Sequence, residues 1–112
     1  WRAADELATQ GVSAAVIDLP WLNRIDDQWV RDTLGRYKRI VTLDNHYLEF
    51  GQGVMVAAAL ARTGVQTAIT PIGLTEIPAC GTNAEVLAHH GLDAASIARR
   101  VVEAGLQTRV NA

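Results

Sequence analysis

The 112-residue sequence contains a single cysteine, no long apolar run and no excess of positive charge. Because Cys80 stands alone, it cannot form an internal disulfide, which fits a reducing cytoplasm. The longest apolar stretch, residues 53–61, is far shorter than the roughly 20 residues that a membrane-spanning helix needs. A formal net charge of −2 provides no basic footprint for nucleic acid. We therefore expect a soluble, cytoplasmic protein with neither a membrane nor a nucleic-acid partner.

The amino-acid composition suits a single domain that spans residues 1–112. With 49% hydrophobic and 20% charged residues, the chain is long enough to bury roughly two thirds of its unfolded surface. It begins without a methionine and enters a helical pattern at once, with no signal-like segment. We expect it to be a piece of a longer protein.

Helical patterns and apolar strand patterns alternate along the chain. Strands are predicted at residues 14–19, 40–43 and 66–72. Helices are predicted at residues 4–8, 27–38, 54–62 and 83–90, followed by one that begins after Asp93. This alternation predicts an α/β fold of three layers, α/β/α, with a mostly parallel, Rossmann-like sheet covered by helices on both faces.

Several residues mark where these elements begin and end. Asp26 and Asp93 are plausible helix N-caps, and Thr82 with Glu85 forms a capping-box pattern. Pro71 argues that the third strand is an edge strand or is close to its end. Pro20 follows the first strand, and Gly11, Gly64 and Gly91 follow helices. The last helix is expected to have an inner face made of Ile97, Val101 and Ala104.

The most informative stretch is residues 44–53, a polar, glycine-containing segment between a strand and a helix. In open parallel sheets, ligands and partners meet the loops at the carboxyl ends of strands. Asp44 and His46 could form an acid/base pair, because a carboxylate can orient an imidazole. The same spacing also suits an interface or a structural hydrogen bond, and His46 is only a weak candidate for catalysis.

Gly51 and Gly53 precede a helix, where free backbone amides can bind an anion such as phosphate. A tight strand-to-helix turn explains the same glycines through positive φ angles or close approach of the backbone. Asp44, His46, Gly51 and Gly53 are therefore the candidate interface or anion-binding residues.

Other polar and aromatic residues give weaker signals. His89 and His90 are adjacent and cannot chelate one ion with the usual four-residue spacing, so no metal site is expected. Cys80 precedes a helix but has no assignable histidine partner. Trp21 and Trp29 could serve either an interface or the core, and an exposed Trp21 would favour a contact surface.

Three strings of residues together resemble the C-terminal domain of transketolase-family enzymes. Residues 16–26 read V-I-D-L-P-W-L-N-R-I-D, where the family typically shows a strand followed by a K-P-L-D-like turn. Residues 39–53 match a strand like R-I-V-T-V-E-D-H followed by G-G-x-G, and residues 80–97 match S-G, E-L-L, G-L-D and a final isoleucine. The combination covers nearly the whole chain.

The sequence departs from the family pattern at several positions. Arg24 replaces a proline, Asp44 and Asn45 replace Glu-Asp, and Phe50 stands where the first of the paired glycines is expected. The opening strand of the family, which usually ends in Gly-Ser, is not found, so the sheet would lack a strand beside its centre.

The resemblance implies a structural and dimer-supporting C-terminal domain, with no cofactor of its own. In the full enzyme it implies thiamine diphosphate and a divalent metal held by upstream domains, a homodimer, and transfer of two-carbon ketol units between sugar phosphates. The isolated domain would then be inactive. The alternative is a docking or regulatory module, as in a 2-oxo acid dehydrogenase beta subunit, or a small-ligand-binding domain.

Overall fold

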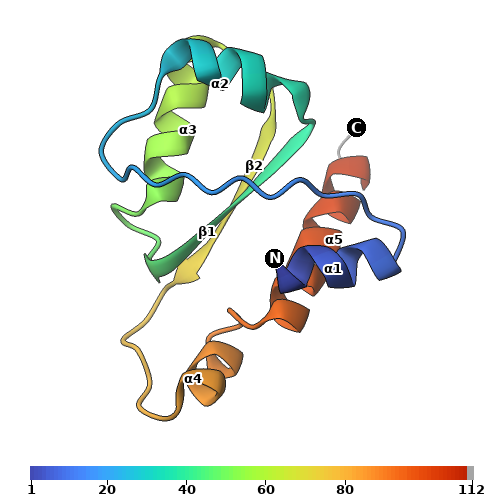
Figure 1. The fold of residues 1–112 in the computed structure, drawn as a ribbon, viewed down its shortest axis with the longest axis vertical. Coiled ribbons are helices and arrows are strands. Elements are labelled where there is room, and N and C mark those ends of the chain that lie inside the picture. The colour runs from blue at the N-terminus through green and yellow to red at the C-terminus, as the bar shows by residue number, and fades with distance from the viewer. Residues whose placement is uncertain (111–112) are drawn as a thin grey trace. The chain divides into compact units, whose positions relative to one another are not determined.

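The computed structural model describes residues 1–110, and the side chains of residues 1–105. It divides into two compact units, which we describe separately. The central unit runs from Leu19 to Glu76, and the terminal unit combines residues 1–18 with the chain from Ile77 onward. Figure 1 shows the helices and strands of both units.

The central unit contains a parallel pair of strands, β1 (Arg39–Tyr47) and β2 (Ala68–Leu74). Arg39 pairs with Ala68, and the register continues to Leu43 opposite Ile72. The connection between the strands is the helix α3 (Gln52–Thr63), which contacts both of them. The expected α/β class with parallel strands is confirmed.

Both strands continue beyond the C-terminal ends that the apolar pattern predicted, and β2 begins at Ala68 instead of residue 66. β1 continues through Asp44 to Tyr47, residues that were assigned to the loop, and β2 includes Gly73 and Leu74. The pairing reaches this far because the Leu48 N–H donates to the Leu74 carbonyl at 3.0 Å. Between Leu43 and Tyr47 the register is irregular, so the regular alternation of faces is interrupted there.

Pro71 lies in the middle of β2, and its missing N–H does not weaken the pairing with β1. In a parallel strand the N–H and C=O groups of alternate residues point to opposite sides. The Ala68 N–H donates to Lys38 and the Leu74 carbonyl accepts from Leu48, so even-numbered residues of β2 point toward β1. Pro71 therefore points to the outer edge, as the edge-strand prediction required.

One face of the sheet is covered by α3 together with α2 (Asp27–Thr33) and the short 3₁₀ helix η1 (Leu34–Arg36). Asp26 caps α2 as predicted, because its side chain accepts the Trp29 N–H at 2.7 Å. The α-helix ends at Thr33 rather than Lys38, with Gly35 in the following 3₁₀ turn. One buried core cluster of this unit consists of Val30, Leu34, Val56, Ala59 and Leu60, against which Ile40 and Ile69 of the sheet pack. Ile72 of β2 is also fully buried.

The strand predicted at residues 14–19 is wrong, since these residues form neither helix nor strand. Val16 and Ile17 are exposed rather than buried. A strand exists only when a neighbour receives its N–H and C=O groups. The described residues contain no strand before β1, so an apolar run of the right composition has no ladder to join.

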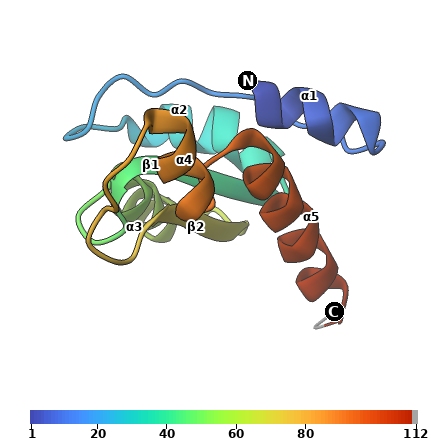
Figure 2. The same cartoon turned by 90° about the horizontal axis from the view of Figure 1, so that it is seen from below.

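The terminal unit is helical, and it contains α1 (Arg2–Thr9), α4 (Asn83–His89) and α5 (Ala94–Val110). α1 lies against α5, as Figures 1 and 2 show. The predicted glycine stops are confirmed at Gly11 and Gly91, which adopt φ angles of +74° and +66°. The inner face of α5 includes the predicted Ala104 and also Ala98, both buried, while Ile97 and Val101 are partly buried.

The predicted caps of α4 and α5 are also confirmed. Thr82 accepts the Glu85 N–H while the Glu85 carboxylate accepts the Thr82 N–H at 2.9 Å, which completes the capping box. Asp93 accepts the Ser96 N–H at 3.2 Å. Hydrogen bonding lowers the pKa of both carboxyls. For Glu85 the largest cause is the hydrogen bond with the Thr82 side chain. For Asp93 it is the hydrogen bond with the Ser96 side chain.

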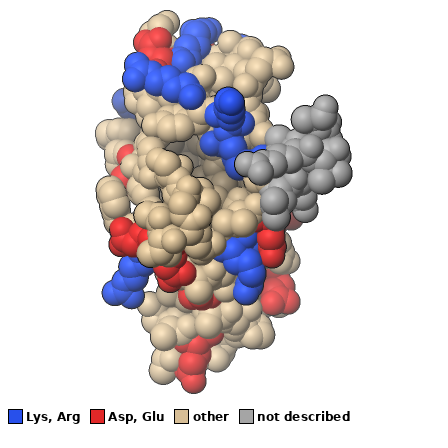
Figure 3. Space-filling view, turned by 90° about the vertical axis from the view of Figure 1, so that its right-hand side faces the viewer, with Lys and Arg blue, Asp and Glu red and all other residues tan. Residues whose placement is uncertain are grey.

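Within the described residues, no helix combines the length and the apolar character needed to cross a membrane. On the face drawn in Figure 3, acidic and basic side chains both occur, with uncharged surface between them.

Lowering the pH should remove the contribution of the capping box to stability. Because the folded pKa of Glu85 is lowered, this contribution is present above the ordinary carboxyl pKa of about 4 and is lost as the pH falls through the folded value. Urea unfolding between neutral and acidic pH should show a smaller loss of stability for Glu85→Gln and for Thr82→Ala than for the unmodified chain. Equal losses in all three proteins would contradict the assignment.

Candidate functional site

The candidate site is built around Asp44, which lies near the end of β1 and is only 7% exposed. Its two carboxylate oxygens accept the Gln52 N–H at 2.7 Å and the Gly53 N–H at 3.0 Å. These are the first two amides of α3, which have no partner within the helix. Since the amino terminus of a helix carries partial positive charge, Asp44 supplies a matching negative charge from the neighbouring strand.

Gly51 and Gly53 allow the strand and the helix to come this close. A Cβ atom on Gly51 would lie 2.8 Å from Cγ of Asp44, and one on Gly53 would lie 2.5 Å from Oγ1 of Thr42. Gly51 has a φ of −76°, so a positive φ angle is not the reason for glycine there. Of the two explanations offered for the turn, close approach of the backbone is the one that these distances support.

The Gln52 side chain connects the same helix terminus to the beginning of the central unit. Its amide nitrogen donates to the Leu19 carbonyl at 2.6 Å and to the Trp21 carbonyl at 3.2 Å. One residue therefore binds Asp44 through its backbone and residues 19–21 through its side chain. The sequence pattern placed Gln52 in the polar segment before the helix, and nothing in that pattern distinguished it from its neighbours.

Phe50 is the only non-glycine residue with a positive φ angle, +64°, among those that the structure describes. Its side chain is 96% exposed. A left-handed backbone conformation costs roughly 1–2 kcal/mol for residues with a Cβ atom, whereas glycine adopts it freely. The glycine that the family resemblance led us to expect at this position would avoid that cost.

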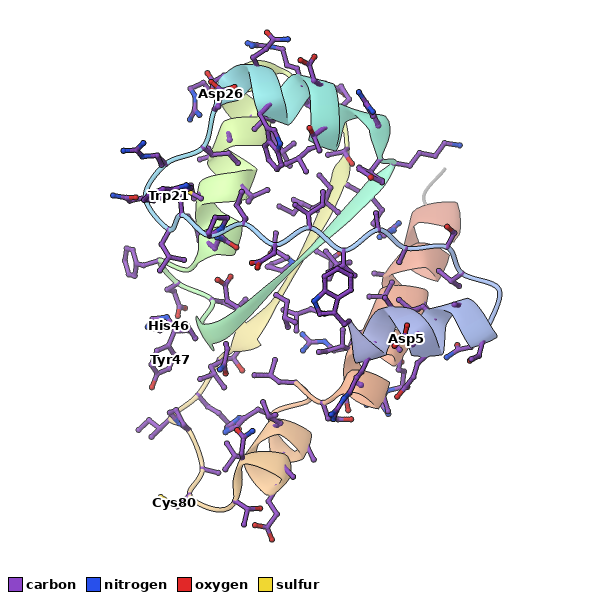
Figure 4. The ribbon with its side chains drawn as sticks, viewed as in Figure 1. Asp5, Trp21, Asp26, His46, Tyr47 and Cys80 are labelled. Carbon is purple, nitrogen blue, oxygen red and sulfur yellow. The ribbon has the colours of Figure 1, made fainter. Side chains whose placement is uncertain are left out.

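The structure brings together three of the four candidate residues, namely Asp44, Gly51 and Gly53. His46 projects from the end of β1 and is exposed (Figure 4). Its Nδ1 atom lies 3.4 Å from the Tyr47 carbonyl, and its ring meets the Tyr47 ring edge-on. The hydrogen bonds of the Asp44 side chain go to α3, so its carboxylate does not orient the imidazole here.

The weaker candidates lie outside this site. Cys80 is exposed in the loop before α4, and the His90 Nε2 atom accepts the Ala79 N–H at 3.0 Å. Trp29 packs against the core of the central unit. Trp21 is 56% exposed, with the Arg24 guanidinium 4.9 Å from its ring centroid, which favours a contact surface at this tryptophan.

Thr42 points its hydroxyl toward α3, where Oγ1 is buried and lacks a hydrogen-bond partner among the described residues. A buried unpaired hydroxyl costs about 1–3 kcal/mol. Its neighbour Asp44 has both carboxylate oxygens engaged by backbone amides. Asp44 therefore stabilises the fold, whereas the unpaired hydroxyl of Thr42 lowers its stability.

The parallel sheet, the connecting helix and the glycine turn after β1 define a small α/β domain with a structural carboxylate at its centre. Comparison with known proteins identifies the family, because residues 1–97 match the transketolase C-terminal domain. The chain belongs to this family, and its helices and small parallel sheet are consistent with the expected three-layer α/β/α fold. The domain occurs in thiamine diphosphate-dependent enzymes.

Individual relatives show 29–34% identity. A putative transketolase C-terminal section from Methanocaldococcus jannaschii is 29% identical over 103 residues, which are 91% of this chain and 32% of that protein. The 1-deoxy-D-xylulose-5-phosphate synthases of Acidovorax sp. and Mycobacterium tuberculosis are 32% and 34% identical over 86% and 88% of this chain. The chain spans only 15% of the length of each of these two synthases.

Replacing Asp44 by asparagine should destabilise the chain. Asparagine offers one acceptor oxygen to the two amides and removes the charge at the helix terminus, so we expect a loss of about 1–3 kcal/mol in the free energy of unfolding. Urea denaturation followed by circular dichroism measures this. Asp18→Asn, at an exposed position, should change stability by less than about 0.5 kcal/mol; a similar loss in both variants would argue against the role of Asp44.

Replacing Thr42 by valine should preserve or increase stability, by up to about 1–2 kcal/mol, because the shape is kept and an unpaired hydroxyl is removed. Thr67→Val provides the matched control, since the Thr67 hydroxyl donates to the Tyr37 carbonyl at 2.7 Å. That variant should lose about 1 kcal/mol. Thermal unfolding of both proteins decides the point, and a loss at Thr42 as large as that at Thr67 would mean that its hydroxyl has a partner in solution.

Proposed function

We propose that the chain is the C-terminal structural and dimer-supporting domain of a transketolase-like enzyme that transfers two-carbon ketol units between sugar phosphates. The upstream domains, on the same chain or another, would bind thiamine diphosphate and a divalent metal. The whole enzyme would be a cytoplasmic homodimer. Membership of the transketolase C-terminal family supports this proposal.

The observation that carries the structural role is the occupation of the α3 amino terminus by Asp44. A diphosphate bound there would need the Gln52 and Gly53 amides, which already donate to a carboxylate of the same chain. A second negative group beside Asp44 would also be repelled. These residues do not fit the diphosphate of the cofactor, and we derive no catalytic step through it in this domain.

In the assembled enzyme the contribution of this chain would be mechanical. The Asp44 hydrogen bonds fix the loop between β1 and α3, and Gln52 fixes the chain at residues 19–21. With these two segments fixed, His46 at the end of β1, Phe50 in the loop and Trp21 would be held in constant positions toward neighbouring domains. His46 remains the candidate for a residue close to an active site formed elsewhere in the enzyme.

A second candidate function follows from the names of the relatives. Several of them are 1-deoxy-D-xylulose-5-phosphate synthases with 32–34% identity to this chain, so the full enzyme could make that product instead of transferring ketol units between sugars. The docking or regulatory alternative predicts a binding partner without any reaction.

Activity measurements with and without the upstream part separate these functions. The isolated chain, supplied with thiamine diphosphate and magnesium, should show no ketol transfer from sugar-phosphate donors. Co-expression with the upstream part should restore turnover, and the product formed distinguishes ketol transfer from synthesis of 1-deoxy-D-xylulose 5-phosphate. Turnover by the isolated chain, or binding of an acyltransferase subunit with no turnover after co-expression, would contradict the proposal.

A further inference from the structure

Phe50 lies at the third position of a tight turn that a glycine would suit better. The Gly51 N–H donates to the Leu48 carbonyl at 3.4 Å, which closes a four-residue turn. Phe50 has a φ of +64°, whereas the φ of Glu49 is not positive. A turn with a positive φ only at its third residue matches type II, in which glycine or asparagine is preferred at that residue. The observed turn therefore places an aromatic residue where its Cβ atom causes strain.

The two ends of this turn are fixed, so a change of conformation would be confined to its middle. The Leu48 N–H donates to the Leu74 carbonyl at 3.0 Å, and Asp44 accepts the amide protons of the first two residues of α3. Turns of type I and type II differ mainly in ψ of the second residue and φ of the third, which is negative in type I. Rotation of the central peptide group therefore converts one form into the other without moving the ends.

Phe50 also occupies a position from which apolar side chains commonly pack onto a helix. Gly51 is the N-cap of α3, so Phe50 is the residue before the cap, and Met55 is the fourth residue of the helix. Apolar side chains at these two positions often form a contact called a hydrophobic staple. The staple is open in the structure, where 96% of the Phe50 side chain is exposed. Met55 is only partly buried, and its thioether is suited to contact with an aromatic ring.

We infer that residues 48–51 form a two-state switch, in which Phe50 either projects into solvent, as in the structure, or folds back onto Met55 with a negative φ. Folding back relieves the backbone strain and removes apolar surface from water. The projecting state keeps the rotational freedom of the Phe50 side chain, which opposes folding back. The two states thus differ in whether the ring is available to a neighbour.

Contact with a neighbouring domain would decide between the two states. A domain that binds the Phe50 ring binds only the projecting state, so it shifts the population toward that state. The assembled enzyme would then contain the projecting form, while the chain by itself exchanges between both. The switch itself is a property of the isolated chain, so it does not depend on the proposed function.

The chain contains one phenylalanine and one methionine, so the two residues of the switch can each be observed as a single NMR signal. The 112-residue chain is labelled with 4-fluorophenylalanine and with methyl-¹³C-methionine. The fluorine spectrum should show two signals, or one signal broadened by exchange, with the folded-back state holding at least about 10% of the molecules. The signal of that state should shift less between H₂O and D₂O, because its ring is partly shielded from solvent.

Substitutions at each side of the staple test the contact. Met55→Ala should lower the population of the folded-back state at least about threefold, since it removes the partner of the ring. In Phe50→Gly, the Met55 methyl signal should move, because the ring that lies over it part of the time is gone. Ile77→Ala is the matched control, because Ile77 is apolar and 85% exposed but belongs to the terminal unit, and it should leave the fluorine spectrum unchanged. Circular dichroism verifies that all three variants fold.

Three results would overturn the switch. The first is a single sharp fluorine signal from a solvent-exposed ring. The second is a folded-back population that Met55→Ala does not reduce. The third is a ring that contacts Met55 in every molecule, because the projecting state would then not be populated.

Discussion

The carboxylate of Asp44 at the amino terminus of α3 is the interaction on which the central unit depends. It joins β1 to α3 through two short hydrogen bonds in a site that is almost completely buried. Hydrogen bonds to charged groups contribute about 1.5–3 kcal/mol, roughly twice the value of neutral ones. The surrounding features follow from this contact: Gly51 and Gly53 leave room for it, and Gln52 extends it to Leu19 and Trp21.

This arrangement divides residues 44–53, at the end of β1 and in the turn to α3, into residues that hold the fold and residues that form the surface. Asp44 and the two glycines face inward and hold the turn, whereas His46, Tyr47 and Phe50 face outward. Amides that could have bound an external anion serve the fold instead. A domain built in this way holds the backbone on both sides of its outward-facing side chains in fixed positions.

The features that could be predicted from the sequence are those governed by local chemistry. The caps at Asp26, Thr82 and Asp93 form as expected, because a short polar side chain needs only the amides of the next turn. Gly64 ends α3 with a φ of +71° for a similarly local reason. The extension of β1 and β2 beyond their apolar residues was not predicted, because it depends on pairing with a segment that is distant in the sequence.

The failures have the same physical origin. Residues 14–19 have the composition of a buried strand but lack a neighbour to pair with, which composition alone cannot reveal. Asp44 and His46 were considered as an acid/base pair, but Asp44 is buried against α3 while His46 is exposed, and the strand register is irregular between Leu43 and Tyr47. The contacts of Asp44 with Gln52 and Gly53 join residues eight and nine positions apart, a separation that matches no helix or strand period.

Amide hydrogen exchange of Gln52 and Gly53 is the most direct measurement of the central claim. The first amides of a helix exchange rapidly when no acceptor covers them. If Asp44 accepts both, the two amides should be strongly protected in the unmodified chain and should lose that protection in Asp44→Ala, while amides in the middle of α3 remain protected. Rapid exchange of Gln52 and Gly53 in the unmodified chain would contradict the account.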